Sequence, residues 1–209
     1  PKAGKSVYKD VKEMWQNDPQ LAGLLDPIIG RRMQHGGRGD TRELVSFAAK
    51  EMHKPDGPRV GLLEFEGFDT HALQGNEDGH HAEILAELDG VLEGFKRQMG
   101  DLYDNTVVVT VTEFGRTASE NGTQGTDHGW ASAIFLAGGL VKGKQVISDW
   151  PGLGSKDLYE GRDLLMTIDA RDVYAEVVKT VFDLNDEDIA RDVFLGYRPE
   201  KSLGLMRST

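Results

Sequence analysis

The sequence predicts an α/β fold in which a parallel-rich sheet is flanked by helices. Two runs of residues, 60–66 (VGLLEFE) and 106–112 (TVVVTVT), predict strands, and the second run, which is apolar or β-branched throughout, has the composition of a strand that is buried on both faces. Between these runs, apolar residues from Ile84 to Met99 recur at steps of three and four, which predicts an amphipathic helix over 82–99. A strand, a helix and a strand in this order form a right-handed crossover, so the two strands are expected to be parallel.

The same periodicities divide the chain into three parts of one predicted α/β domain, 1–209. Residues 1–58 form a lead-in of short helices and loops, with helical periodicity up to Arg32. Residues 59–183 carry the motifs and form the core. Residues 184–209 form a C-terminal tail.

The other expected elements each follow a local signal. A capping-box signature precedes one helix, an apolar run indicates a further strand, a valine-rich stripe indicates a long helix, and an asparagine caps a short acidic helix. These elements are, in order, the helix from Asp40 with Glu43 to Met52, the strand 131–137, the helix 170–182, and the helix after Asn185.

Composition excludes several classes of function. The formal net charge of −11 over 209 residues disfavours nucleic acid and anionic membranes as main partners, because both require clustered Lys and Arg side chains. The chain has no cysteine, which excludes disulfides, thiolate metal ligands and a cysteine nucleophile. The sequence contains no apolar run long enough to span a bilayer, so no membrane insertion is expected.

Polar side chains follow the two predicted strands, at the edge where ligands bind in open α/β sheets. Asp69 and His71 come after the first strand, Glu113 comes after the second, and Asp127 and His128 precede the third. Carboxylate and imidazole groups together suit a divalent cation such as zinc or manganese, which can polarise an ester oxygen or lower the pKa of a water. The sequence therefore predicts a metal site, although each residue alone is also typical of an ordinary turn or helix cap.

Arginine and histidine residues nearby admit two interpretations. Arg116 could bind a phosphate or sulfate group through its planar fork of donors, or it could form a salt bridge to an acidic loop such as the one around Glu120. His80 and His81 precede a helix, and we expect them to be exposed and not to bind a metal.

The chain resembles one bacterial family in a set of short motifs. These are GFDTH (67–71), TEFGRT (112–117) and GTDHG (125–129), followed by an apolar strand and GGLVKG (138–143). This family is domain of unknown function fifteen-oh-one, which is often exported by the twin-arginine route. It is placed in the alkaline phosphatase-like or sulfatase-like superfamily, where a parallel sheet between helices carries two metal ions at its strand ends.

The resemblance implies which residues hold metal. Asp69, His71 and His128 match one site of the superfamily by their order and context. The other site usually takes an Asp-His pair at a strand end, and that place is held by Glu113 and Phe114. Phe114 cannot ligate a metal, so one site for zinc, manganese or calcium is favoured over two.

The resemblance also implies a longer protein. The nucleophile of the superfamily, a Ser, a Thr or a modified residue, lies on an early strand, and nothing in residues 1–59 resembles that strand. We therefore expect the chain to be the C-terminal half, with a nucleophile elsewhere or absent. An uncovered sheet edge would favour a homo-oligomer or pairing with the missing N-terminal half. A small anionic ester as substrate and a periplasmic or secreted location are implied as well.

Three functions follow from these observations. The first is a metal-dependent hydrolase of phosphate or sulfate esters, with Asp69, His71, Glu113 and His128 as ligands and Asp127 as a ligand or as the residue that orients His128. The second is a catalytically inactive module that keeps the fold and binds a ligand or partner. The third is a purely structural role in which the histidines are hydrogen-bonded loop residues.

Overall fold

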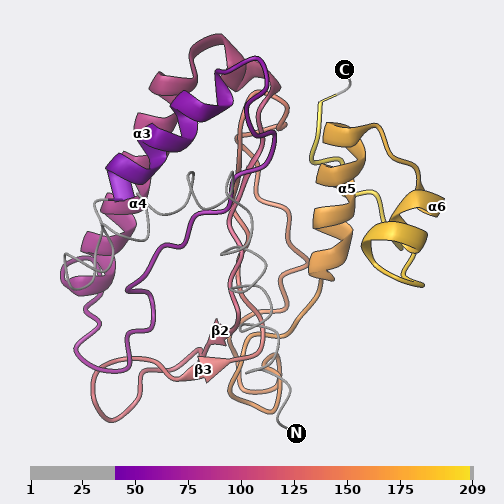
Figure 1. The fold of residues 1–209 in the computed structure, drawn as a ribbon. Coiled ribbons are helices and arrows are strands. Elements are labelled where there is room, and N and C mark those ends of the chain that lie inside the picture. Colours follow the sequence, from indigo (N-terminus) through magenta and orange to yellow (C-terminus); the bar gives the residue numbers. More distant parts are fainter. Residues whose placement is uncertain (1–40, 208–209) are drawn as a thin grey trace, which may run out of the picture. The chain divides into compact units, whose positions relative to one another are not determined.

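The computed structural model describes residues 41–207. The chain divides into two compact units, Pro1–Glu66 and Gly67–Thr209. Figure 1 shows the elements of each unit coloured along the sequence. The helices expected before Arg32 and the cap expected at Asp40 lie outside the described residues. Within the part that the structure describes, no helix is both long enough and apolar enough to cross a membrane.

Helix α3, Thr41–Met52, is the helical element of the first unit's described residues, and it confirms the helix predicted to end at Met52. Glu43 in its first turn and Lys50 in its last turn complement the helix dipole. Val45 and Ala49, four residues apart on one face, are its buried residues.

Helix α4, His80–Met99, begins the regular structure of the second unit and confirms the helix predicted over 82–99. Ile84, Val91 and Met99 are buried on one face. The helix ends at Gly100, whose φ of 52° lies in the region that favours glycine, and a 3₁₀ helix, η1 (Gly100–Asn105), follows.

Two short antiparallel ladders follow η1. Strand β1 (Val108–Val109) pairs with β4 (Leu136–Ala137), and β2 (Gly115–Arg116) pairs with β3 (His128–Gly129). The described residues contain no parallel ladder, and residues 60–66 are not assigned to a strand. The parallel-rich α/β sheet therefore stays a prediction.

The ladder between β1 and β4 becomes irregular beyond Val109. The amide of Thr110 still donates to the carbonyl of Phe135 at 3.0 Å, but the amide of Phe135 donates to the Thr110 hydroxyl at 2.8 Å, where a regular ladder would use the main-chain carbonyl. Val111 is 65% exposed, although it belongs to the apolar run expected to be buried. The strands predicted over 106–112 and 131–137 are therefore much shorter in the structure.

Helix α5, Ala170–Phe182, carries the main core of the second unit and confirms the helix predicted over 170–182. Its buried Val173 and Val177 pack with Val141, Leu205 and Met206, and residues of β1 and β4 lie against this cluster. After α5, Asn185 caps α6 (Asp186–Asp188) in a capping box with Asp188, as predicted. A π-helical segment, η2 (Ile189–Val193), continues from α6.

One carboxylate of α5 holds the C-terminal segment. The amides of four consecutive residues donate to Glu176, at distances from 2.5 to 3.3 Å; they belong to Leu203, Gly204, Leu205 and Met206. Because Leu205 and Met206 belong to the core cluster, this carboxylate links the backbone of the segment to the packing of α5.

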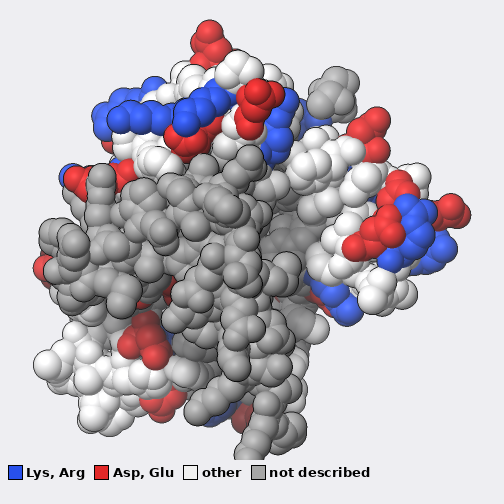
Figure 2. Space-filling model, in the orientation of Figure 1, with Lys and Arg blue, Asp and Glu red and all other residues white. Residues whose placement is uncertain are grey.

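Acidic and basic side chains alternate over the described part of the surface in Figure 2, without a broad area of one sign on that part of this face. The net negative charge is thus spread rather than concentrated there.

Replacing Glu176 with alanine is expected to destabilise the protein by about 2–3 kcal/mol, because buried amides lose a charged acceptor. Urea unfolding measures this change, and hydrogen exchange should show faster exchange at residues 203–206. Glu187→Ala, at an exposed position, is the matched control and should change the free energy of unfolding by less than about 0.5 kcal/mol. Equal effects of the two substitutions would contradict the role given to Glu176.

Candidate metal centre

Three segments of the second unit meet at the candidate metal centre: residues 67–74, strand β2, and the loop that leads into β3. The register of the β2–β3 pair places Arg116 opposite His128. Main-chain hydrogen bonds join the other two segments, namely Leu73 to Thr123, Gln74 to Gln124 and Thr126 to Thr70, at 2.8–3.1 Å. Residues far apart in sequence are therefore fixed side by side.

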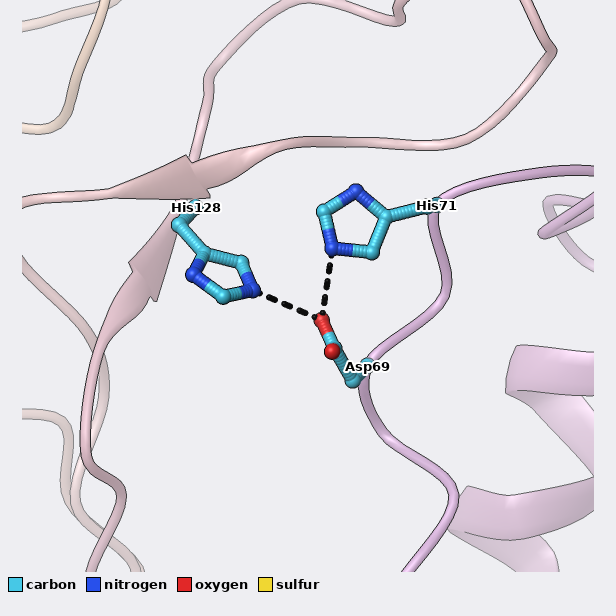
Figure 3. Close-up of side chains that lie close together, drawn as sticks. All are labelled: Asp69, His71 and His128. Carbon is cyan, nitrogen blue, oxygen red and sulfur yellow. Dashed lines mark hydrogen bonds and ion pairs between the residues drawn. The ribbon is translucent and has the colours of Figure 1, made fainter.

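Asp69, His71 and His128 form a compact group of possible metal ligands. Oδ1 of Asp69 lies 3.0 Å from Nε2 of His71 and 3.0 Å from Nε2 of His128 (Figure 3). One ligand atom from each residue lies within 4.8 Å of the other two. The side chains are 54%, 47% and 49% exposed, so an ion and a substrate can reach them from solvent.

Asp127 orients one of these histidines. Its Oδ1 lies 3.2 Å from Nδ1 of His71 and accepts a hydrogen bond of 2.9 Å from the Asn121 amide. The bond from Asn121, followed by that from His71, holds the pKa of Asp127 below its ordinary value. A carboxylate on Nδ1 leaves Nε2 of His71 directed at the metal position, which is the usual arrangement behind metal-binding histidines. Asp127 thus contacts His71, whereas the sequence suggested His128.

Arg116 holds the carboxylate of Asp69. Its Nη2 donates to Oδ1 of Asp69 at 2.5 Å and to the carbonyl of Phe68 at 2.9 Å, and its Nη1 donates to the carbonyl of Thr126 at 2.7 Å. Partial desolvation raises the pKa of Asp69, but the hydrogen bond with His128 and the charge of Arg116 outweigh it, so the net pKa is lowered. Arg116 thus forms a salt bridge with Asp69, and not with Glu120 as the sequence suggested, while its role in binding an anion stays a prediction.

Phe114 supports the ring of His128. The two rings stack with their centroids 3.6 Å apart and their planes 14° from parallel. The guanidinium of Arg116 lies 5.5 Å from the centroid of the Phe114 ring. A residue that cannot ligate a metal thus fixes the orientation of one that can.

Asn121, a residue with no role predicted from the sequence, organises the loop that contacts His71. Its side-chain nitrogen donates to the carbonyl of His71 at 3.0 Å, and its oxygen accepts from the amides of Thr123 and Gly125, both at 3.0 Å. A Cβ on Gly125 would lie 2.3 Å from the carbonyl carbon of His71, so only glycine fits there. The Asn-Gly pair at Asn121 was the available signal, because it is typical of turns in which the asparagine side chain bonds the backbone.

The remaining predicted residues lie outside this group. Glu113 is exposed and is not one of the three grouped ligands, although it directly precedes Phe114. His80 is exposed, as expected. His81 is only partly exposed and packs edge-on against Phe68. Burial, with smaller effects of Arg116 and His80, lowers the pKa of His81 and favours its neutral form.

Comparison with known proteins gives one positive result. No curated protein and no solved structure matches the chain significantly. The model of one protein family matches residues 35–194, which is more than half of the chain and contains every residue of the candidate metal centre. The chain therefore belongs to the family described as protein of unknown function (DUF1501).

Proposed function

We propose that the chain binds one divalent metal ion through Asp69, His71 and His128 and hydrolyses small phosphate or sulfate esters. The observation that carries this proposal is the convergence of two imidazole nitrogens on one carboxylate oxygen at an exposed position. The resemblance to the alkaline phosphatase-like or sulfatase-like superfamily supports the choice of esters, and that placement is part of the proposal.

The donor set favours particular metals. Two imidazole nitrogens and one carboxylate oxygen suit zinc or manganese, whereas calcium usually takes six or more oxygen ligands. Three protein ligands leave a coordination position open, as in catalytic zinc sites. A cation held there would polarise the ester oxygen and lower the pKa of a water.

The residues around the group fit a metal-binding role because each of the three proposed ligands is held by a contact with a neighbouring side chain. Arg116 positions the Asp69 carboxylate, Asp127 bonds Nδ1 of His71, and Phe114 stacks on His128. Such contacts hold the ligands in a geometry suited to metal, so less conformational entropy is lost when the ion binds.

A second candidate function is a metal-binding module without ester hydrolysis. Two observations favour it: Phe114 takes the place where the resemblance expects a second-site ligand, and both terminal nitrogens of Arg116 already bond protein acceptors. Metal binding without turnover of phosphate or sulfate esters of p-nitrophenol would favour this module over the hydrolase.

Substituting a ligand is expected to abolish metal binding. Elemental analysis after dialysis against zinc should find about one ion per chain in the wild type and almost none in His71→Ala or His128→Ala. His80→Ala, at an exposed histidine outside the group, is the matched control and should keep its zinc. Equal zinc contents in all four proteins would rule out this site.

Asp127→Asn is expected to weaken zinc affinity by about 10–100-fold without changing the stoichiometry, because the substitution removes the charge behind His71 and keeps the shape. Calorimetric titration measures the affinity, and Glu120→Gln, an exposed acid on the same loop, is the control.

The pH dependence of stability provides an independent check on the electrostatic role of Asp127. Because its pKa is lowered in the folded chain, its contribution to the stability of the zinc-free protein is present above the ordinary value of 3.8 and is lost as the pH falls through the lowered value. The difference in unfolding free energy between wild type and Asp127→Asn should therefore disappear in strong acid. A difference that persists there would contradict this electrostatic role.

A further inference from the structure

A second arginine, Arg162, is connected to the candidate metal centre through the backbone. The amide of Thr117, next to β2, donates to the carbonyl of Asp127 at 3.0 Å, and the amide of Ala118 donates to the carbonyl of Arg162 at 3.1 Å. Thr117 also forms a bridge with Asp163. The adjacent residues Thr117 and Ala118 therefore link the backbone of Arg162 to the backbone of Asp127.

The guanidinium of Arg162 is anchored along one edge. Its Nη2 donates to Oδ2 of Asp163 at 3.1 Å, and its Nε lies 3.0 Å from Oδ1 of the same residue. The Asp163 side chain is only 7% exposed, whereas that of Arg162 is 56% exposed. Nη1 has no acceptor among residues 41–207, so a second pair of N–H groups is available to a ligand.

An aromatic pair fixes the loop that carries Arg162. Tyr159 and Asp163 exchange main-chain hydrogen bonds of 2.9 and 3.0 Å, and the ring of Tyr159 stacks on Trp130 with centroids 5.5 Å apart. Trp130 is the second residue after His128, so their Cα atoms are at most about 7 Å apart. The loop is therefore held beside the ladder that carries a metal ligand.

Arg116 is less suited to binding an anion. Its side chain is 22% exposed, and its terminal nitrogens donate to Asp69, Phe68 and Thr126. Binding a substrate oxygen there would break contacts that position a metal ligand. Arg162 can donate to a substrate oxygen through Nη1 and keep its ion pair with Asp163.

We propose that Arg162 binds the anionic group of the ester, a tetrahedral phosphate or sulfate, beside the metal. This inference rests on the proposed metal-dependent hydrolysis, and it assigns the substrate-binding role to a residue other than Arg116. The planar guanidinium fork matches two oxygens of such an anion.

Local charge makes anion binding depend on the metal. Without a cation, the carboxylates of Asp69, Asp127 and Asp163 outnumber the guanidinium groups of Arg116 and Arg162, so an anion is repelled. A divalent ion reverses the sign of this sum. Anion affinity should therefore rise when zinc is bound.

The test is a titration of inorganic phosphate, and separately of inorganic sulfate, into the full chain with and without zinc. Nuclear magnetic resonance of the arginine Nε–H groups reports binding independently of turnover. We expect the Arg162 signal to shift and Arg162→Gln to weaken phosphate binding by at least about tenfold, with zinc content unchanged. Arg191→Gln is the matched control, because Arg191 is also exposed and paired with the next residue, Asp192.

The outcomes separate this inference from the proposed function. Unchanged phosphate affinity in Arg162→Gln, or a shift of the Arg116 signal in its place, would overturn the role of Arg162. A wild-type chain that holds no zinc would disprove the metal centre. Because the inference places the anion beside the metal, it would then fail together with the metal centre, whereas zinc binding with unchanged phosphate affinity in Arg162→Gln would overturn the inference alone. The ratio of the phosphate and sulfate affinities shows which anion is preferred.

Discussion

Oxygen Oδ1 of Asp69 is the point on which the candidate metal centre depends. It lies within 3.0 Å of nitrogen atoms from Arg116, His71 and His128. Removing this carboxylate would leave an arginine without its ion pair and two imidazoles without a common partner. The two imidazole nitrogens would also be the metal ligands, so an ion must compete with any proton that they share with Asp69. Metal binding should therefore release protons, and metal affinity should increase with pH.

The sequence could predict that Asp69, His71 and His128 come together, but not the contacts that support them, and their role as metal ligands stays a prediction. Asp69, His71 and His128 lie near apolar runs, and carboxylate and imidazole side chains at the ends of predicted strands indicate a metal-binding or catalytic site. Which side chain contacts which depends on the register of β2 and β3, and a slip of one residue would turn His128 to the other face. The stacking of Phe114 on His128 and the bond between Asp127 and His71 follow from that register and from loop geometry. Neither leaves a periodic signal in the sequence.

The helices were predicted more accurately than the strands for a related reason. Helices α4 and α5 bond within their own segments, and their apolar stripes show the same period in the sequence. A strand needs a partner from elsewhere in the chain, and an apolar run does not specify one. Thus Leu62 is 94% exposed within a run that was expected to be a strand and is not assigned to one, and the ladder between β1 and β4 is regular over two residue pairs.

The small size of the β2–β3 ladder has a consequence for the stability of the folded chain. Each of these strands has two residues and joins His128 to Arg116, while the segment that carries Asp69 and His71 is bonded to the loop before His128 through residues such as Thr70 and Thr126. An ion coordinated by both segments would close a loop of more than fifty residues and reduce the entropy of the unfolded chain. In a protein without cysteine, the metal would act as the cross-link that a disulfide provides elsewhere. Zinc loading should then raise the melting temperature as well as supply the reactive centre.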